Sequence, residues 1–539
     1  MFKVIDFFGF GHFFQKAIRT LYNGCNSSVQ LSHGTCQRFD MGRGIRQGCP
    51  ISPFLFILVT QVMAAHVKKA SFQGISVFGK EIKLSQLADD STIFVKNSEE
   101  IDKVIKCIEE FSRISGLKMN KNKSTLFSLK DCFLKEICGI PIKDEVTHLG
   151  IKVCKDLNQR SLLNFDPIIE KIKNRFSMWL MRDLSLYGRV LLSKAEGLSR
   201  SVYISMSADV PKKVVRELYK ILYDFIWKKK IHYLRKDIIN NNRDFGGLEV
   251  LNFADLNNVF KIKWIIEFIK NKDSVWNVFP NYIFNSLGGI NFLLKCNFSV
   301  EKIPVKMANF HKQALLAWQL IYKHNFSPHQ YFIWNNKDIL YKKKSIFNQT
   351  WYDSGILTVS QLLNEQGLLL TYSEFLNKFM IPVRPREYSI IFDAIPGRVV
   401  SLLRNPGFSP VSIDHQTSFC SDIIFIRDIN IVVDKCSNKY IRNILKTNYL
   451  PCSTMFWSTK YENIHWKKVW SITNRFFINN KIREVSYKIL HKIYPVKELL
   501  ERFNLNIENT CEFCSNAKES LTHLFFLLYL FKNVLVGCI

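Results

Sequence analysis

The first 150 residues alternate between short strand-like runs and helical runs that carry apolar faces. Residues 27–47 alternate in polarity as paired strands do, with Gly34 as the predicted turn. Ser52 and Pro53 then predict a helix start, a cap residue followed by a first-turn proline. The next residues are apolar on nearly all faces of such a helix, so we expect it to be buried.

Further along this region the pattern predicts a strand hairpin and a second helix. Short strands are expected around 75–78, 81–87 and 92–96. Residues 99–115 place their apolar side chains on one stripe of an amphipathic helix, which Gly116 ends. The order strand, helix, strand hairpin, helix and strand predicts an α+β fold with a mixed sheet and helices on one face.

From about residue 160 the pattern becomes mainly helical. A cluster of prolines between Pro382 and Pro410 favours a linker, and a second helical block follows it. The predicted regions are 1–150 (sheet and helices), 151–245 (helical), 246–385 (basic and helical), 386–420 (linker), 421–505 (second helical block) and 506–539 (a tail with Cys and His).

The charge balance indicates a polyanionic partner. Lys and Arg number 75 against 46 Asp and Glu, for a net charge of +29, and aromatic residues make up 14% of the chain. Positive charge attracts phosphate backbones and aromatic rings stack on bases, so nucleic acid is the favoured partner. A merely basic surface, or one that contacts anionic lipid, is the alternative.

Cysteine usage and hydropathy bear on the compartment. The 14 cysteines mostly stand singly, which is typical of reduced thiols in an intracellular protein of the nucleus or cytoplasm. The stretch from Gln47 to Ala65 carries no Asp, Glu, Lys or Arg, but it contains Pro50 and Pro53 and has basic flanks. A buried helix is the better interpretation, and we expect no membrane partner.

Two adjacent carboxylates, Asp89 and Asp90, lie between apolar runs in IKLSQLADDSTIFVK (82–96). A hairpin can present both at its tip while the flanking strands are buried. Their repulsion is relieved when a divalent cation binds between them, and Mg²⁺ prefers carboxylates together with substrate phosphates. Taken alone, Asp-Asp-Ser is also ordinary turn chemistry.

The surrounding boxes resemble the palm of reverse transcriptases from non-LTR retrotransposons, the long interspersed elements. The acidic box of that family is matched by Leu87 to Asp90, and its Arg-Gln-Gly-Cys-Pro-x-Ser-Pro box by Arg46 to Pro53. Its Gly-Leu-Lys-x-Asn-x-x-Lys box is matched by Gly116 to Lys123, and its Leu-Gly strand by His148 to Gly150. Segments 184–203, 225–230 and 246–265 resemble the helical region after the polymerase, so the resemblance covers nearly the whole chain.

The resemblance implies a partial right-hand polymerase palm followed by a helical thumb and C-terminal region. It implies template-primed nucleotidyl transfer on an RNA template and a DNA primer, with Mg²⁺ as cofactor. Asp89 and Asp90 would be the catalytic metal ligands. Arg46, Gln47 and Gly48 would lie against the incoming nucleotide and template, with Gly48 allowing close backbone approach.

Two of these residues have ordinary alternatives. Lys123 would lie near the triphosphate as a point charge, or it is a solvated surface lysine. Gln47 could instead satisfy backbone groups at the helix entrance.

Two-metal chemistry also needs a carboxylate from another strand. In the family that strand comes before the segment matched by residues 7–22, and neither Asp6 nor Asp40 matches its motif. We therefore expect the chain as written, without the fingers and endonuclease of the family, to be unable to extend a primer. The alternatives are a non-catalytic nucleic-acid-binding remnant and an unstable product.

The tail contains CEFCSNAKESLTH (511–523), in which Cys511, Cys514 and His523 have zinc-ligand spacing. The family places a fourth Cys at the position of Leu528, and Cys538 lies ten residues further on. The site would hold Zn²⁺ weakly, or its thiols are ordinary ones.

Two basic stretches are candidate contacts for nucleic acid. KKKIHYLRK (228–236) could contact phosphates and stack a ring on a base, and YKKKS (341–345) is similar. Each could equally be a solvated face.

Overall fold

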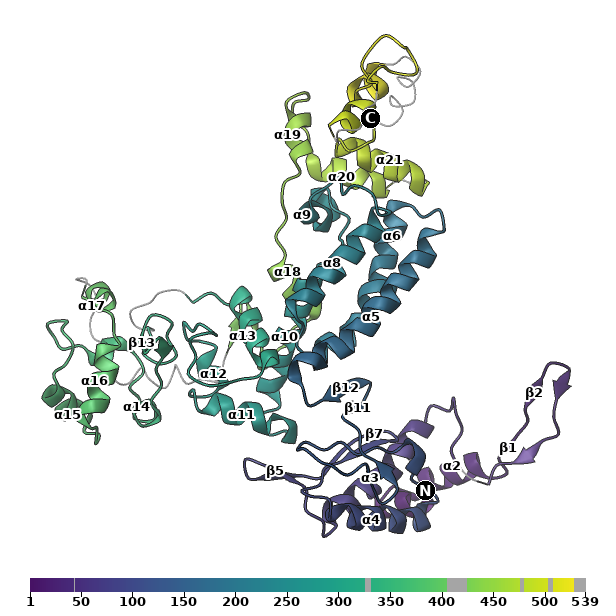
Figure 1. Ribbon diagram of the computed structural model, residues 1–539, viewed down its shortest axis with the longest axis vertical. Coiled ribbons are helices and arrows are strands. Elements are labelled where there is room, and N and C mark those ends of the chain that lie inside the picture. The colour runs from purple at the N-terminus through teal and green to yellow at the C-terminus, as the bar shows by residue number, and fades with distance from the viewer. Residues whose placement is uncertain (43, 325–330, 405–423, 476–478, 503–507, 528–539) are drawn as a thin grey trace. The chain divides into compact units, whose positions relative to one another are not determined.

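The computed structural model describes residues 1–42, 44–324, 331–404, 424–475, 479–502 and 508–527 (Figure 1). The chain divides into two compact units. The first comprises Met1–Arg160 with Asp273–Tyr282, and the second comprises Ser161–Lys272 with Ile283–Ile539.

The first unit is α+β, which confirms the predicted fold class. Its helices are α1 (Phe2–Phe7), α2 (His12–Tyr22), α3 (Ser52–Lys69), α4 (Glu100–Ser115) and the 3₁₀ turn η1 (Lys121–Lys123), with η4 (Val275–Asn277) in the later segment. Its strands are β1 (Asn26–Ser27), β2 (Gln30–Leu31), β3 (Gly34–Thr35), β4 (Phe39–Asp40), β5 (Ile75–Val77), β6 (Lys80–Ile82), β7 (Leu84–Leu87), β8 (Asp90–Ile93), β9 (Glu136–Ile137), β10 (Ile140–Pro141), β11 (Glu145–His148) and β12 (Ile151–Cys154).

The expected continuous mixed sheet is wrong for the described residues. Each named strand pairs with one neighbour in a two-stranded antiparallel sheet. These strands are two to four residues long, and most pair across a tight turn, where little loop entropy is lost. Other segments are joined by single backbone contacts instead of a longer ladder of hydrogen bonds. Examples are the bond from Lys96 N to Gln73 O (3.0 Å) and the parallel bridge of Leu126 with Ile142.

Helices α3 and α4 pack against each other in the core of this unit. The apolar stripe of α4 is buried as predicted, and Gly116 ends the helix with a left-handed φ of +76°. Val104 and Cys107 of α4 pack with Val67 of α3. The N-terminal part of α3 packs instead on α1 and α2 through Leu55.

Two predictions about α3 need correction. Ser52 is the first helical residue rather than the cap, which is Ile51, and the Ser52 hydroxyl bonds the Tyr22 hydroxyl (2.8 Å). The helix is also buried on one face only, because α1, α2 and α4 cover one side while Phe54 and Ile57 are 67% and 57% exposed. Within the described residues, no helix is long and apolar enough to cross a membrane.

The second unit is mainly helical. It includes most of α5 (Leu157–Leu180), α6 (Leu186–Leu192), the π turn η2 (Ser193–Leu198), α7 (Ser199–Ser207), α8 (Lys212–Ile226), α9 (Lys236–Asn240), η3 (Arg243–Phe245), α10 (Phe253–Lys270), the end of α11 (Val278–Asn285), α12 (Ile290–Leu293), α13 (Asn309–Ile321) and α14 (Gln349–Asp353). It continues with η6 (Val359–Leu362), α15 (Tyr372–Phe379), α16 (Pro385–Asp393), α17 (Gly397–Leu403), α18 (Asn438–Leu445), α19 (Cys452–Ser458), α20 (Trp466–Arg475), α21 (Asn480–Leu490), α22 (Lys497–Glu501) and the π turn η8 (His523–Leu527). Short hairpins pair β13 (Leu340–Tyr341) with β14 (Lys344–Ser345), and β15 (Phe425–Ile426) with β16 (Ile429–Asn430).

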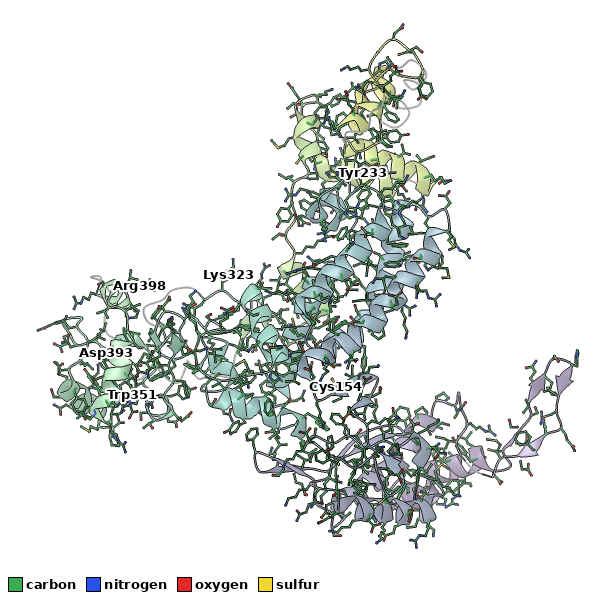
Figure 2. The ribbon with its side chains drawn as sticks, viewed as in Figure 1. Cys154, Tyr233, Lys323, Trp351, Asp393 and Arg398 are labelled. Atoms are coloured by element: carbon green, nitrogen blue, oxygen red, sulfur yellow. The ribbon has the colours of Figure 1, made fainter. Side chains whose placement is uncertain are left out.

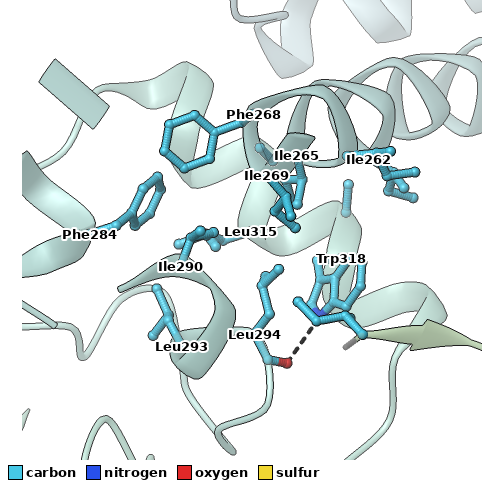
Figure 3. Packing of buried hydrophobic residues seen from close by; sticks show 14 of the residues in the cluster. Ile262, Ile265, Phe268, Ile269, Phe284, Ile290, Leu293, Leu294, Leu315 and Trp318 are labelled. Carbon is cyan, nitrogen blue, oxygen red and sulfur yellow. Dashed lines mark hydrogen bonds between the residues drawn. The ribbon is translucent and has the colours of Figure 1, made fainter. Parts of the chain in front are cut away.

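The largest core of this unit gathers around α10 and α13. Figure 3 shows Ile262, Ile265 and Ile269 of α10 near Leu315 and Trp318 of α13. The Trp318 indole satisfies its buried N–H by donating to Leu294 O (3.1 Å). Residues 424–441 pack into the same core, so segments on both sides of 405–423 share it.

Part of the predicted linker is helical instead. Pro385 is the first residue of α16 and Pro396 caps α17, so these prolines start helices rather than interrupt them. Both helices pack into a second core that contains Trp351, labelled in Figure 2. The rest of that segment, 405–420, lies outside the described residues.

Helices α5 and α8 lie side by side in this unit (Figure 1). The rings of Phe176 and Phe225 stack between them, with centroids 4.0 Å apart. On the surface, Lys173 Nζ pairs with Glu217 Oε1 at 2.9 Å.

Candidate functional site

The acidic pair lies at the tip of the β7–β8 hairpin. Leu87 pairs with Asp90 across the strands, which leaves Ala88 and Asp89 as the two turn residues. Ala88 has a φ of +53°, a left-handed conformation that a residue with a Cβ adopts at a cost of about 1–2 kcal/mol. The turn therefore forms although its sequence lacks a glycine.

The strands below this turn are anchored in the core. Leu84 of β7 and Ile93 of β8 pack against the cluster of Val67 and Val104 from α3 and α4. The base of the hairpin is thus half-buried while Asp89 and Asp90 stay exposed. This arrangement matches the sequence prediction.

The carboxylate oxygens of Asp89 and Asp90 are available to coordinate a metal ion. Among the described hydrogen bonds and ion pairs, neither side chain has a partner, so no neighbouring lysine neutralises them. Adjacent carboxylate oxygens are the donors that Mg²⁺ prefers, and this donor set fits that ion. No third acidic, His or Cys side chain joins them in a three-ligand group within the part of the chain that the structure describes.

The Arg-Gln-Gly box precedes α3 as an exposed loop. Arg46 Nη2 donates to Cys25 Sγ (3.1 Å), while Gln47 and Gly48 are exposed. Gly48 has a φ of +84°, and a Cβ there would meet nothing within 4 Å. In the free protein its backbone conformation, rather than close packing, requires glycine.

Cys49, which the sequence analysis did not single out, adds a polar thiol to this loop. Hydrogen bonding to the backbone of Ile51 at the start of α3 lowers the pKa of Cys49. Its place within the Arg46–Pro53 box was the only signal available.

Lys123 ends the short turn η1 and is exposed. Its backbone N–H donates to Asn120 Oδ1 (3.2 Å), and Met119 anchors the segment against α4 through Ile101 and Ile105. No hydrogen bond or ion pair among the described residues joins Lys123 to Asp89 or Asp90.

A contact that the sequence analysis missed joins the Leu-Gly strand to the acidic hairpin. Thr92 Oγ1 and His148 Nδ1 are 2.8 Å apart, which links β8 to β11. His148 pairs with Ile151, so Leu149 and Gly150 form the turn, and both have positive φ. The family resemblance of this strand was the only hint of the contact.

The tail brings together the predicted zinc ligands. The ligand atoms of Cys511, Cys514 and His523 lie within 4.8 Å of one another, and Cys514 Sγ is 3.3 Å from His523 Nε2. Hydrogen bonds from the backbone of Asn516 and Ala517 are the main causes that lower the pKa of Cys514 to about 7. Soft sulfur and imidazole donors at this spacing fit Zn²⁺.

Backbone hydrogen bonds close the loop over residues 511–517, which carries both cysteines. Cys511 N donates to Ala517 O (2.8 Å), and a bridge pairs Thr510 with Lys518. The positions considered for a fourth ligand, Leu528 and Cys538, lie outside the described residues.

The segments that contain the acidic hairpin and the Cys/His loop each match a known protein family. Residues 3–153 match the family described as reverse transcriptase (RNA-dependent DNA polymerase), and residues 451–530 match the family described as zinc-binding in reverse transcriptase. The chain is also 23% identical over 271 residues to the transposon TX1 uncharacterized 149 kDa protein of Xenopus laevis, which covers 49% of this chain and 20% of the relative. These matches support a reverse transcriptase domain of the non-LTR retrotransposon kind within this chain.

A second relative matches a shorter stretch of this chain. It is a putative ribonuclease H protein of Arabidopsis thaliana, 27% identical over 121 residues, or 21% of this chain and 19% of the relative. The matched stretch therefore spans about a fifth of each of these curated relatives.

The basic stretch 228–236 makes contacts within its own fold through part of its side chains. Lys228 pairs with Asp183 (3.8 Å) and His232 with Asp224 (3.2 Å). Tyr233, labelled in Figure 2, packs edge-on against Trp227, so its ring is not a free stacking surface. Lys229 and Lys230 remain exposed.

The second basic stretch, 341–345, forms the β13–β14 hairpin. Lys342 Nζ lies 5.4 Å from the ring centroid of Tyr341, and Lys344 Nζ donates to Glu301 O (2.7 Å). These lysines are mainly surface groups of the hairpin.

Proposed function

We propose that the chain binds an RNA template and a DNA primer, and that Asp89 and Asp90 hold Mg²⁺ at the point where nucleotides would be joined. The observation that carries the proposal is the hairpin tip, which presents two adjacent unpaired carboxylates above a half-buried base that packs on the core. The match of residues 3–153 to the reverse transcriptase family supports the same assignment.

The neighbouring residues receive roles that follow from their chemistry. When bound, Mg²⁺ would supply charge stabilisation for the attacking and leaving oxygens of nucleotidyl transfer. The exposed Gln47 and Gly48 would face the nucleotide and template, and Arg46 would steady that loop through Cys25. Lys123 would place a positive charge near the triphosphate.

We further propose that the chain as written binds template and primer without extending the primer. Two-metal chemistry needs an opposing carboxylate, and the described residues supply only the adjacent pair. The non-catalytic nucleic-acid-binding function follows from the same observation, with the net charge of +29 as its support.

A primer-extension assay with purified protein, an RNA template, a DNA primer and Mg²⁺ tests both proposals. We expect template–primer binding that weakens steeply with salt, and no extension. The matched variants are Asp89→Asn and, as control, Asp102→Asn, an exposed acid of α4 that pairs with Lys106.

Extension that Asp89→Asn abolishes and Asp102→Asn preserves would support the metal site and overturn the proposed inactivity. Absence of binding at low salt would overturn the nucleic-acid assignment itself.

A further inference from the structure

Within the second unit, the segment after α18 is held firmly against the loop that joins α9 to α10. Asn241 donates from Nδ2 to Tyr449 O (2.6 Å) and accepts from Tyr449 N (3.0 Å). The backbone N–H of Asn242 donates to Asn448 Oδ1 (3.1 Å). These contacts fix the side chains on both segments relative to one another.

Four basic side chains meet along this junction. Lys446 Nζ donates to Asn242 Oδ1, and Arg442 lies one helical turn before Lys446. Arg243 lies on the opposite segment. The fourth, Lys194, is the second residue of η2, a π-helical distortion of a kind that often occurs at functional positions, and its side chain lies near Arg243 and Arg442.

The local carboxylates do not balance these charges. Glu249 Oε2 pairs with Arg243 Nε at 3.5 Å. Asp255 is the second acid near the cluster, and burial raises its pKa to about 6. Four cations therefore face two carboxylates.

The cations of this cluster are partly shielded from water, so their excess positive charge is unfavourable unless an anion binds. Burial lowers the pKa of Lys194 and of Lys446, and the nearby Arg442 lowers both further, although Glu249 acts in the opposite direction. Half-buried cations that repel one another are costly unless a negative group pairs with them. Lys194, Arg442 and Lys446 nevertheless all remain partly exposed, so a ligand can reach them.

We propose that Lys194, Arg243, Arg442 and Lys446 form a binding site for a backbone phosphate of nucleic acid. The proposal rests on the proposed function and adds a contact outside residues 3–153, the segment that matches the polymerase family. A singly charged phosphate would offset half of the excess positive charge, and the two guanidinium groups suit its oxygens because they can donate in pairs.

The test measures RNA affinity as a function of salt, with a fluorescein-labelled oligouridylate and full-length protein. We expect Arg442→Ala and the double variant Lys194→Ala/Arg442→Ala to lower the slope of log K against log salt by about 0.7, the value for one phosphate contact of a single strand. Lys435→Ala, an exposed lysine just before α18, is the matched control and should keep the wild-type slope.

A second arm separates phosphate of RNA from free phosphate, and it also reports folding. Inorganic phosphate should raise the melting temperature of the wild type and of Lys435→Ala, but not that of the double variant. Without phosphate, the double variant should melt at or above the wild-type temperature, because cation repulsion is removed.

An unchanged RNA slope in a folded double variant would overturn the proposal, even if phosphate stabilised the wild type. Variants of Asp89 should leave this slope unchanged, so a loss of metal binding at the hairpin is distinguishable from failure of this site.

Discussion

At Gly197, in the π turn η2, a Cβ would lie 2.6 Å from Cζ of the Phe176 ring. The Phe176 ring has little room to move away, because it is 3% exposed and stacked on Phe225. We therefore predict that Gly197→Ala destabilises the chain by about 1–3 kcal/mol, the range for an overpacked core.

The matched control for this prediction is Gly188→Ala in α6. A Cβ there meets Ser185 Oγ at an ordinary 3.5 Å, and alanine favours a helix over glycine by about 0.5–1 kcal/mol. Urea unfolding of both variants is the measurement. A Gly197→Ala protein as stable as Gly188→Ala would contradict the packing described for α5 and η2.

His491 gives a prediction about pH. It is 5% exposed, contacts Gly246 O through Nε2 (2.7 Å) and stacks on Trp470. Burial lowers the pKa of His491 to about 4, and the hydrogen bond to Gly246 opposes this shift.

In the unfolded chain His491 is protonated near pH 6.5, whereas in the folded chain it is protonated only near pH 4. Stability should therefore fall as the pH drops from about 6.5 to 4, by up to about 3 kcal/mol from this residue. Urea midpoints at pH 7 and pH 5 check it. His491→Gln, which keeps a donor for Gly246 O, should show a smaller loss, and an equal loss in both proteins would refute the assignment.

Single residues also show what the sequence could and could not predict. Asp89 and Asp90 were predicted at a hairpin tip because apolar alternation flanks them, and the register confirms this position. The sequence predicts that Gly48 allows close approach of nucleotide or template, and the structure adds a second reason for glycine there, a left-handed φ of +84°. The contact of Thr92 with His148 depends on residues 56 positions apart, which no local pattern encodes.

At the scale of elements, periodicity predicted α4 and its glycine end well, because a single helix face and a C-terminal glycine leave a local signature. Periodicity failed for α3, whose apolar residues indicate what could be buried but not which neighbours cover it. The proline cluster was misleading for the same reason, since Pro385 and Pro396 are as suitable for starting helices as for a linker.

The Cys/His loop is the element that offers the sharpest chemical test. We predict that the protein binds Zn²⁺ and that Cys514→Ser lowers the bound zinc severalfold, because the cluster supplies only three described ligands. The measurement is zinc content by mass spectrometry.

Cys452→Ser is the control for the zinc prediction, since Cys452 is exposed and lies within the same matched region. Equal zinc in Cys514→Ser and Cys452→Ser would rule out the cluster as the binding site.

For the whole molecule, the sequence indicated a nucleic-acid partner through charge, but charge alone does not locate the contacts. The structure assigns Asp273–Tyr282 to the first unit, although it lies far along the chain from Met1–Arg160. Such an assignment depends on tertiary packing. The proposed function requires that the β7–β8 hairpin bind a metal ion.

The most direct test of that claim counts bound Mn²⁺ by electron paramagnetic resonance, with template–primer and nucleoside triphosphate present. Wild-type protein should bind Mn²⁺ that the double variant Asp89→Asn/Asp90→Asn does not bind, while both proteins bind the RNA template equally well. Equal amounts of bound Mn²⁺ in the two proteins would contradict the assignment of this hairpin as the metal site.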